Sequence, residues 1–381
     1  MKLKRRFLLI IVYLAFLSCL LPAAIYIYKN PAYNFDMLGY MALVIRMDRA
    51  HTIEEIHTIT YSSARQTVPP DEYEKLTEAL PYRKKFATDA FEFKKILPNY
   101  IVKPLYTWLC WLFYKSGFSL TIATVMPSII SFLIIGLFLF YWLRKYLRDI
   151  IAFPAAALIM CSIFTTAVAR LSSPDCLSAL FLFLSAYFIF EKRNLTLMTL
   201  FLLLSIFSRV DNIITCFFII SFLTFSKRWK RIDKKEYFFM LAVLVIAYLT
   251  IILPVRQFGW SIFYYTQYAR HIDYSRDFDQ PVTLLSYLSL IYSKLVTAFV
   301  STHFTFFSFL SLLILSNAGF SFRKLSFDQS FLLLLASIVF IRLLLLPDLS
   351  DRFYFGFYLI IIILLVRKLS SQNLMLANED R

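Results

Sequence analysis

Arginine and aspartate recur together in this chain, next to long apolar segments where charged side chains are costly. The residues are Arg170 and Asp175 in ARLSSPDCL, Arg209 and Asp211 in SRVDN, and Arg342, Asp348, Asp351 and Arg352 in and before LPDLSDRFY. An arginine at the edge of a membrane is stable only when it is paired or faces a wet cavity. A guanidinium also grips a phosphate group with two parallel hydrogen bonds. The pattern therefore predicts a polar cavity suited to a lipid-linked phosphate.

Each carboxylate also has a simpler interpretation as a helix cap, and that interpretation stays open. In SSPDC a serine can cap a helix, the proline suits its first position and Asp175 complements the helix dipole. Asp211 with Asn212, and Ser350 with Asp351, can do the same. Capping does not explain the arginines, whereas pairing around a cavity accounts for both residue types.

A further carboxylate, Asp36, follows the first apolar run in YNFDMLGYMALVIRMD, residues 33–48. We expect this stretch to lie on the outer membrane surface as an amphipathic helix. There Asp36 can simply satisfy the helix N-terminus. If it faces the arginines instead, it can serve as the general base that deprotonates an acceptor hydroxyl. Cations would stabilise a phosphate leaving group, and attack from the opposite face would invert the anomeric centre of a sugar.

The composition indicates what kind of fold must position these groups. The chain has 381 residues, is 60% hydrophobic and only 17% charged, and has a mean hydropathy of +0.67. Several apolar runs approach the roughly 20 residues that cross a bilayer. We therefore predict a single all-α domain over residues 1–381, a polytopic transmembrane helical bundle of about ten spans. The first span covers 7–28, and the remaining spans lie within 119–366, at 119–142, 151–169, 176–190, 195–208, 211–226, 237–254, 297–316, 329–346 and 354–366.

The hydrophilic block 29–116 is predicted to be an outer loop with surface helices. Its pieces 37–57 and 71–86 have one apolar face, and 101–116 is rich in aromatic residues. The short loops on the other side are basic, which places both termini and the tail 367–381 in the cytoplasm. These loops are 144–148, 191–193, 227–235, 322–324 and 367–368. The net charge of +16 is then explained by cytoplasmic loops and anionic lipids rather than by nucleic acid.

No motif in the chain calls for a cofactor or a metal. The five cysteines lack CxxC spacing and lie mostly in apolar runs. HTIEEIH offers His51 and His57 with two glutamates, but not the HExxH spacing of a zinc helix. His271, with Asp273 and Asp277 in ARHIDYSRDFD, can contact an acceptor or form an ordinary polar loop. We expect no metal, although divalent metal use stays open.

Four segments together resemble the GT-C superfamily of membrane glycosyltransferases, which includes protein O-mannosyltransferases and the aminoarabinose transferase. They are NFDMLGYMALVIR, RLSSPDCLSALFLFLSAYFIF, LLLSIFSRVDNIITCFFII and DLSDRFYFGFYLIIII. The resemblance implies a polyprenyl-phosphate or pyrophosphate sugar donor, with Asp36 as the catalytic carboxylate and Asp175 as a second polar contact. It also implies donor-phosphate binding by basic residues of the first loop, with Arg83, Lys84, Lys85 and Lys103 as candidates. Many members carry an acidic pair where Asp36 is followed by Met37, and the large outer domain of oligosaccharyltransferases is missing here.

The predicted function is therefore inverting sugar transfer from a polyprenyl-phosphate-linked donor to an acceptor hydroxyl. The acceptor can be a glycan, a lipid or a protein. We place the protein in a bacterial inner membrane, among membrane lipids, with the site facing the periplasm. The expected substrate-binding residues are Asp175, Arg170, Arg209, Asp211, Arg352, Lys84, Lys85 and Lys103.

Two alternatives remain. A flippase or transporter for lipid-linked glycans is disfavoured by the scarcity of glycine, with six in the chain, and by the lack of internal repeats. A polysaccharide polymerase or ligase would use a large late outer loop, for which 255–283 is the candidate.

Overall fold

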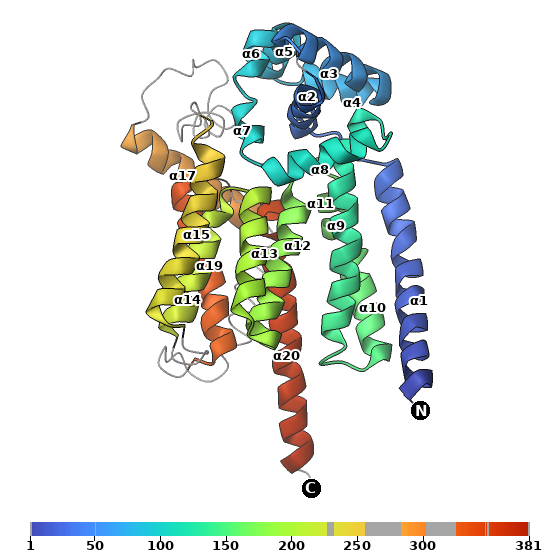
Figure 1. Ribbon diagram of the computed structural model, residues 1–381, viewed down its shortest axis with the longest axis vertical. Helices are drawn as coiled ribbons and strands as arrows, with labels where there is room; N and C mark the ends of the chain where they lie inside the picture. Colours follow the sequence, from blue (N-terminus) through green and yellow to red (C-terminus); the bar gives the residue numbers. More distant parts are fainter. Residues whose placement is uncertain are drawn as a thin grey trace.

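The computed structural model describes residues 2–49, 51–226, 232–255, 283–301, 325–346, 348 and 350–379. Its described part consists of helices, apart from one isolated bridge between Ala32 and Leu171. Figure 1 shows two layers: a bundle of long helices, and a cap of short helices that covers one end of it. The N- and C-termini both lie at the opposite end of the bundle. The predicted all-α polytopic fold is confirmed.

The bundle is formed by the apolar runs of the sequence. Its helices are α1 (Lys2–Lys29), α9 (Leu120–Leu143), α10 (Asp149–Met160), α11 (Ile163–Ala169), α12 (Asp175–Tyr187), α13 (Leu195–Ser208), α14 (Asn212–Phe225), α15 (Lys234–Ile252), α19 (Phe327–Leu345) and α20 (Phe355–Glu379), with α17 (Leu284–Ser301) beside them. A π-helical turn, η1 (Phe188–Lys192), extends α12, and a 3-10 turn, η3 (Asp351–Tyr354), precedes α20.

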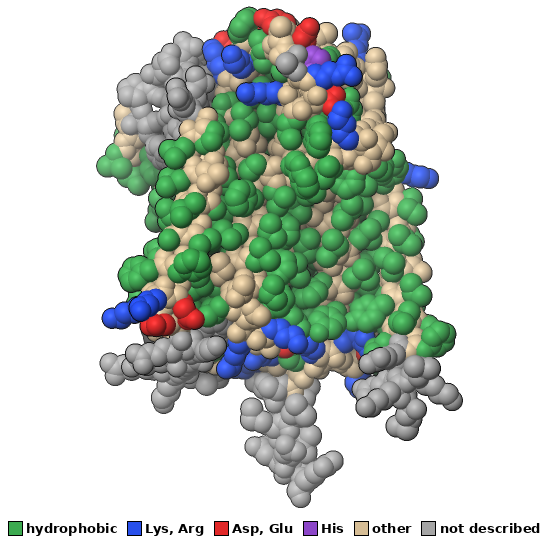
Figure 2. Space-filling view, viewed as in Figure 1, with side chains coloured by type: hydrophobic (Ala, Val, Ile, Leu, Met, Phe, Trp, Pro, Cys, Tyr) green, Lys and Arg blue, Asp and Glu red, His purple; other side chains and the backbone are tan. Residues whose placement is uncertain are grey.

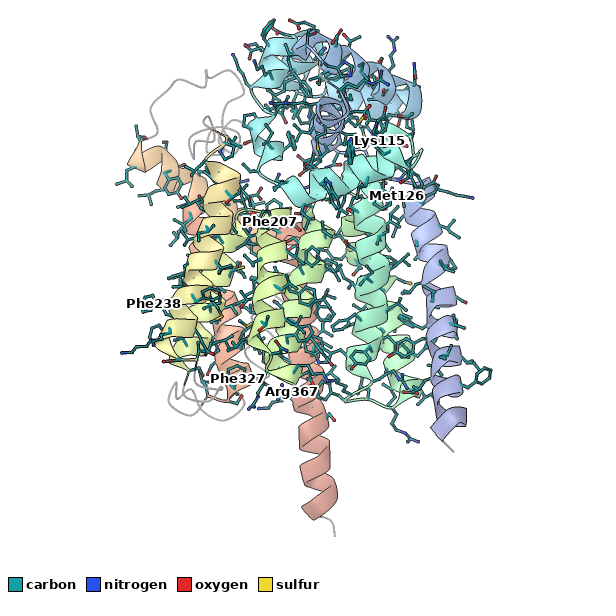
Figure 3. All side chains as sticks on the ribbon, in the orientation of Figure 1. Lys115, Met126, Phe207, Phe238, Phe327 and Arg367 are labelled. Atoms are coloured by element: carbon teal, nitrogen blue, oxygen red, sulfur yellow. The ribbon has the colours of Figure 1, made fainter. Side chains whose placement is uncertain are left out.

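Five described helices are long and apolar enough to cross a membrane, or six if α10 and α11 count as one bent span. Three shorter apolar helices, Leu195–Ser208, Asn212–Phe225 and Leu284–Thr297, add to them. On the face that Figure 2 shows, hydrophobic side chains cover the middle of the bundle, with charged side chains above and below them. In Figure 3, Lys115 marks the cap end and Arg367 the opposite end. This pattern is that of an integral membrane protein.

One predicted span needs correction. The span 151–169 is interrupted after Met160, and its two halves meet at 57°. The cytoplasmic tail 367–381 stays a prediction: α20 continues as a helix to Glu379, whereas the last candidate span ends at Ser370. Helix α17 covers Leu284–Ser301 and so includes the first residues of the predicted span 297–316, whereas the rest of that span and nearly all of the loop 255–283 lie outside the described residues.

The cap is built from seven helices, more than the surface helices that the sequence indicated. They are α2 (Asp36–Asp48), α3 (Ile53–Thr67), α4 (Pro70–Thr77), α5 (Pro81–Thr88), α6 (Ala90–Lys94), α7 (Pro98–Ile101) and α8 (Pro104–Lys115). Proline begins four of them, where its missing N–H is no loss. Thr52 and Glu55 form a capping box at the start of α3. The frequent prolines thus divide one polar block into many short helices.

The position of α2 contradicts its prediction as a surface helix. Every residue from Met37 to Ile45 is buried, and α2 packs against α3, α7, α8 and α9. It is the centre of a second hydrophobic core, which belongs to the cap and includes Tyr40, Phe93, Tyr100 and Tyr106. A helix that is apolar on all sides must be buried. Asp36 therefore lies where the cap core meets the bundle.

Candidate active site

Asp36 begins α2, and its carboxylate contacts the nearby Asn34 and two side chains from distant parts of the chain. Tyr100 of α7 donates a hydrogen bond to Oδ1 over 3.3 Å. Asn34 donates to Oδ2 over 3.2 Å, and Arg352 of η3 lies 3.2 Å from the same oxygen. The contact with Arg352 joins the first cap helix to the start of the last bundle helix. The sequence prediction that Asp36 faces an arginine is thus met in the structure.

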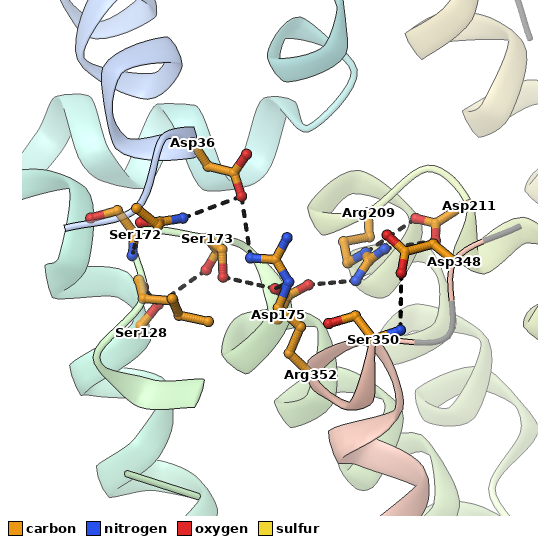
Figure 4. A network of polar contacts seen from close by, with 12 residues as sticks. Asp36, Ser128, Ser172, Ser173, Asp175, Arg209, Asp211, Asp348, Ser350 and Arg352 are labelled. Carbon is orange, nitrogen blue, oxygen red and sulfur yellow. Dashed lines mark hydrogen bonds and ion pairs between the residues drawn. The ribbon is translucent and has the colours of Figure 1, made fainter. Parts of the chain in front are cut away.

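From Asp36 an alternating chain of acids and bases runs into the bundle. Arg352 Nε lies 3.5 Å from Asp175, and Asp175 also forms an ion pair with Arg209. Arg209 in turn pairs with Asp211, with Nη2 2.8 Å from Oδ2. Figure 4 shows Arg352 between Asp36 and Asp175, and Arg209 between Asp175 and Asp211. Arg342 of α19 forms a second ion pair with Asp211 and closes the chain.

We call these six side chains the Asp36–Arg342 network. Its outer pair is the most exposed: the side chains of Asp36 and Arg352 are each 25% exposed, whereas those of Asp175, Arg209, Asp211 and Arg342 are 2%, 9%, 15% and 3% exposed. Three carboxylates face three guanidiniums, so the network is neutral as a whole. Its accessible end is therefore the pair that contains the predicted base.

Strong interactions between opposite charges stabilise the buried end of the network. Burial alone would raise the pKa of Asp211, but the adjacent guanidiniums of Arg209 and Arg342 outweigh burial and hold that pKa well below its usual range. Burial likewise opposes the charge of Arg209, and the carboxylates of Asp211 and Asp175 nevertheless raise its pKa. Both groups stay ionised near neutral pH, so the charges of the inner part of the network do not change over the physiological pH range.

Backbone contacts between two distant turns hold the accessible end in place. Ala32 N donates to Arg170 O over 2.9 Å, and Ser172 N donates to the side chain of Asn34 over 3.3 Å. On the bundle side, Ser128 donates to the carbonyls of Leu171 and Ser173. The segment that carries Asp36 is thereby joined to the segment that carries Asp175.

Lys103 lies beside the network without belonging to it. Its ammonium is 5.3 Å from the ring centre of Tyr100 and 5.8 Å from that of Tyr40. Within the described part of the chain it forms no ion pair, although Asp36 is its strongest electrostatic partner. Burial lowers the pKa of Lys103, and the attraction of Asp36 offsets only part of that effect. A cation without a paired carboxylate, next to the predicted base, suits an anionic ligand.

The remaining predicted binding residues lie elsewhere. Arg170 Nε donates to the carbonyl of Asn30 over 2.5 Å, and its guanidinium lies over the ring of Tyr26, so it joins α1 to the bundle rather than pairing with the acids. Lys84 and Lys85 lie exposed on α5, where Lys85 is 3.4 Å from Glu92. Only Lys103 of the predicted lysines lies beside Asp36, and the binding roles of the other three residues stay predictions.

Sequence reasoning missed three residues that contact the network. Asn34 stands two positions before Asp36, and that spacing is a signal that was available. Tyr100 is 64 positions away and gives no sequence signal. Phe353 lies between two arginines, with its ring centre 4.0 Å from the Arg209 guanidinium and 5.0 Å from that of Arg352. The face of an aromatic ring attracts a cation, so the Phe353 ring offsets part of the repulsion between the Arg209 and Arg352 guanidiniums, which share the carboxylate of Asp175.

Within the described residues, no three His, Cys, Asp or Glu side chains are grouped so that they could hold a metal ion. Each acid of the network already faces an arginine. The prediction that the protein uses no metal or other cofactor is not tested by this geometry.

Residues 102–255 match the family model described as dolichyl-phosphate-mannose-protein mannosyltransferase. This family is of the GT-C type. The match confirms the resemblance to the GT-C superfamily. It includes Lys103, Asp175, Arg209 and Asp211, whereas Asp36 and Arg352 lie outside it. No curated protein and no solved structure matches the chain. The family match and the apolar bundle together indicate a membrane glycosyltransferase.

Proposed function

We propose that this protein transfers a sugar from a polyprenyl-phosphate-linked donor to an acceptor hydroxyl, with inversion. The observation that carries the proposal is the contact of Asp36 with Arg352 at the accessible end of an otherwise buried network. The family match, to a family whose description names a dolichyl-phosphate-linked mannose, supports a lipid-linked donor. We further propose that the whole chain acts as one catalytic domain.

In the proposed reaction each charged side chain has its own role. The acceptor hydroxyl transfers its proton to the Asp36 carboxylate as its oxygen attacks the anomeric carbon. The bond from that carbon to the phosphate oxygen breaks, and polyprenyl phosphate leaves with the bonding electrons. Lys103 and Arg352 stabilise the negative charge that develops on the leaving oxygens. Asp175 and Arg209 contact the reaction only through Arg352, which they hold in position.

The charge balance favours an anionic donor at this place. The six charges of the Asp36–Arg342 network cancel, and the Asp348 carboxylate also acts on Arg352, so Lys103 supplies a local positive charge beside Asp36 rather than a net charge of the whole region. A sugar–phosphodiester carries one negative charge and would offset the ammonium. Since a buried charge without a partner is costly, binding of such a donor would be favoured by the pairing it supplies.

We also propose the cellular setting expected from the basic loops: a bacterial inner membrane with the cap facing the periplasm. There the donor would reach the site from the outer leaflet, and the acceptor would be a glycan, a lipid or a protein. No metal has a task in the proposed steps. Treatment with EDTA should therefore leave sugar transfer unchanged, and its loss would show that a divalent metal takes part.

The experiment is a transfer assay with the purified protein in proteoliposomes. Labelled undecaprenyl-phosphate sugar is incubated with a cell-envelope extract as acceptor source, and labelled product is followed for wild type and Asp36→Asn. Transfer by the wild type and its loss in the variant support the proposal. Movement of the labelled donor across the bilayer without transfer would instead support the flippase alternative. Equal transfer by both proteins would show that Asp36 is not the base.

A further inference from the structure

Gly39 is one of only six glycines in the chain, and the ring of Tyr100 lies directly against it. A Cβ atom added at Gly39 would lie 2.3 Å from Cε2 and 2.4 Å from Cδ2 of Tyr100. Real Cβ atoms essentially never approach another heavy atom within 3.0 Å. Glycine within a helix costs roughly 1 kcal/mol relative to alanine. The close approach of the ring gives a physical reason for glycine here.

This contact determines where the Tyr100 hydroxyl points. Gly39 and Asp36 are three positions apart and therefore share a face of α2. With its ring over Gly39, Tyr100 reaches back and donates to Asp36 Oδ1 over 3.3 Å. The ring is held from the side by Tyr40, with the ring centres 5.1 Å apart and the planes at 75°. Tyr100 itself is only 6% exposed, so its position is fixed by packing.

The two oxygens of Asp36 are thus held from opposite sides. The cap core supplies Tyr100 to Oδ1. The side facing the bundle supplies Arg352 and Asn34 to Oδ2, and Asn34 is itself held by the backbone of Ser172. Removing either side would let the carboxylate rotate about its side-chain bonds. The orientation of Asp36 therefore depends on the fit between the two layers of the protein.

We infer that Tyr100 is a positioning residue that fixes the orientation of the Asp36 carboxylate, and that Gly39 is the position that lets its ring approach. This inference rests on the proposed role of Asp36 as the base. A misplacement of a reacting group by about 1 Å can cost roughly a hundredfold in rate. The Tyr100 hydroxyl touches Asp36 and not the reacting atoms, so loss of the hydroxyl alone acts on turnover and not on donor binding.

Two single substitutions test the Tyr100 hydroxyl and the contact of its ring with Gly39 separately. Tyr100→Phe keeps the ring on Gly39 and removes only the hydroxyl, and we expect kcat to fall about tenfold, the equivalent of one lost hydrogen bond of ~1.4 kcal/mol. Gly39→Ala displaces the whole ring, and we expect kcat to fall roughly a hundredfold. In Tyr100→Phe the KM for the polyprenyl-phosphate donor stays unchanged, whereas Gly39→Ala also moves the ring that lies beside the Lys103 ammonium and should raise that KM.

A double substitution shows whether the two residues act together. In the variant Tyr100→Ala all side-chain atoms beyond Cβ are absent, so an alanine at position 39 has none of the crowded atoms of Tyr100 beside it. We therefore expect Gly39→Ala combined with Tyr100→Ala to have the same kcat as Tyr100→Ala alone. Additive losses would show that Gly39 acts independently of Tyr100 and would overturn that half of the inference.

The chain offers a matched control for each single substitution. Gly136 in α9 is also crowded, because an added Cβ would lie 2.5 Å from Leu20 Cδ1, but it belongs to the bundle core. Tyr61 is a buried tyrosine of the cap whose hydroxyl has no hydrogen-bond partner among the residues that the structure describes. Gly136→Ala and Tyr61→Phe should therefore leave kcat unchanged. Equal losses in these controls would indicate a general effect of core substitution instead.

A structure of the Gly39→Ala protein gives a reading that is independent of activity. We expect the Tyr100 hydroxyl to lie beyond hydrogen-bond distance of Asp36 in this variant. The inference is overturned if the bond persists, if Tyr100→Phe retains the wild-type kcat, or if KM changes while kcat does not. Absence of sugar transfer in the wild-type protein would contradict the proposed function, and the structural reading would still decide the role of Gly39.

Discussion

The two ends of the bundle each gather charged residues, but they do so in different ways. At the end away from the cap, Glu191 of η1 accepts hydrogen bonds from Trp142, over 3.1 Å, from Lys145, over 2.9 Å, and from Tyr146. All three donors come from one short stretch at the end of α9 and just beyond it. At the cap end, the Asp36–Arg342 network draws on segments from position 36 to position 352.

The difference separates a structural contact from a candidate site. The Glu191 cluster joins two neighbouring helix ends, and its one acid is surrounded by donors. The network at the cap end has an accessible acid–base pair, and Lys103 lies beside it without an ion-pair partner in the described chain. Burying six charges is costly, and packed apolar residues often stabilise a protein equally well. Such an arrangement is better explained by a ligand than by stability.

The largest contrast between the two ends is expected in activity. Asp36→Asn should lower the rate of sugar transfer by roughly 10²- to 10⁴-fold, because an amide cannot accept the hydroxyl proton. Glu191→Gln, which keeps a carbonyl oxygen for Trp142 and Tyr146, should leave the rate unchanged. The measurement is the proteoliposome transfer assay on both variants. A comparable loss from Glu191→Gln would remove the distinction drawn here.

The next contrast is in stability. Arg209→Met leaves two carboxylates, Asp175 and Asp211, without their shared partner inside the protein. Breaking a buried pair in this way typically costs roughly 3–5 kcal/mol. Lys145→Met removes a more exposed partner, with 28% of its side chain accessible, and should cost at most about 1 kcal/mol. Thermal unfolding in detergent, followed by tryptophan fluorescence, compares the two, and equal losses would contradict the assigned burial costs.

If Lys103 binds the donor phosphate, donor binding should depend on pH. Only its protonated form attracts a phosphate, and burial lowers its pKa below the ~10.4 of an ordinary lysine. Binding of undecaprenyl phosphate should thus be complete below that lowered pKa and weaken as pH rises through it. Lys103→Arg stays charged, because the pKa of arginine exceeds ~12, and should bind equally well up to about pH 10. Parallel pH curves for the two proteins would exclude Lys103 as the phosphate contact.

The smallest effect is expected at the surface of the cap. Lys85 is 60% exposed and pairs with Glu92, so Lys85→Ala should change stability by at most about 1 kcal/mol. The KM for the donor should also be unchanged, whereas Lys103→Met should raise it. Steady-state kinetics on the two variants would decide which lysine serves the donor. A raised KM in Lys85→Ala would show that Lys85 of α5 also contributes to donor binding.

The sequence identified most members of the Asp36–Arg342 network because charges near lipid are rare, and their roles in catalysis and binding stay predictions. Asp175, Arg209, Asp211 and Arg352 stood out at the ends of apolar runs, and the structure joins all four. The prediction from sequence was wrong for α2, which was expected at the membrane surface. The helices of residues 53–115 and α9 pack around α2 and bury it. The sequence also could not separate Lys103 from Lys84 and Lys85, since all three are basic residues of one loop.

The sequence by itself determined that this is an all-helical membrane protein with acids and bases at helix ends. Hydrophobic run length and the cost of charge in lipid are local properties that composition reveals. Only the tertiary structure decided which charges pair, that Arg170 serves the backbone of Asn30, and that Tyr100 reaches Asp36 across Gly39. These outcomes depend on the packing of residues tens or hundreds of positions apart, and no local pattern encodes such distances.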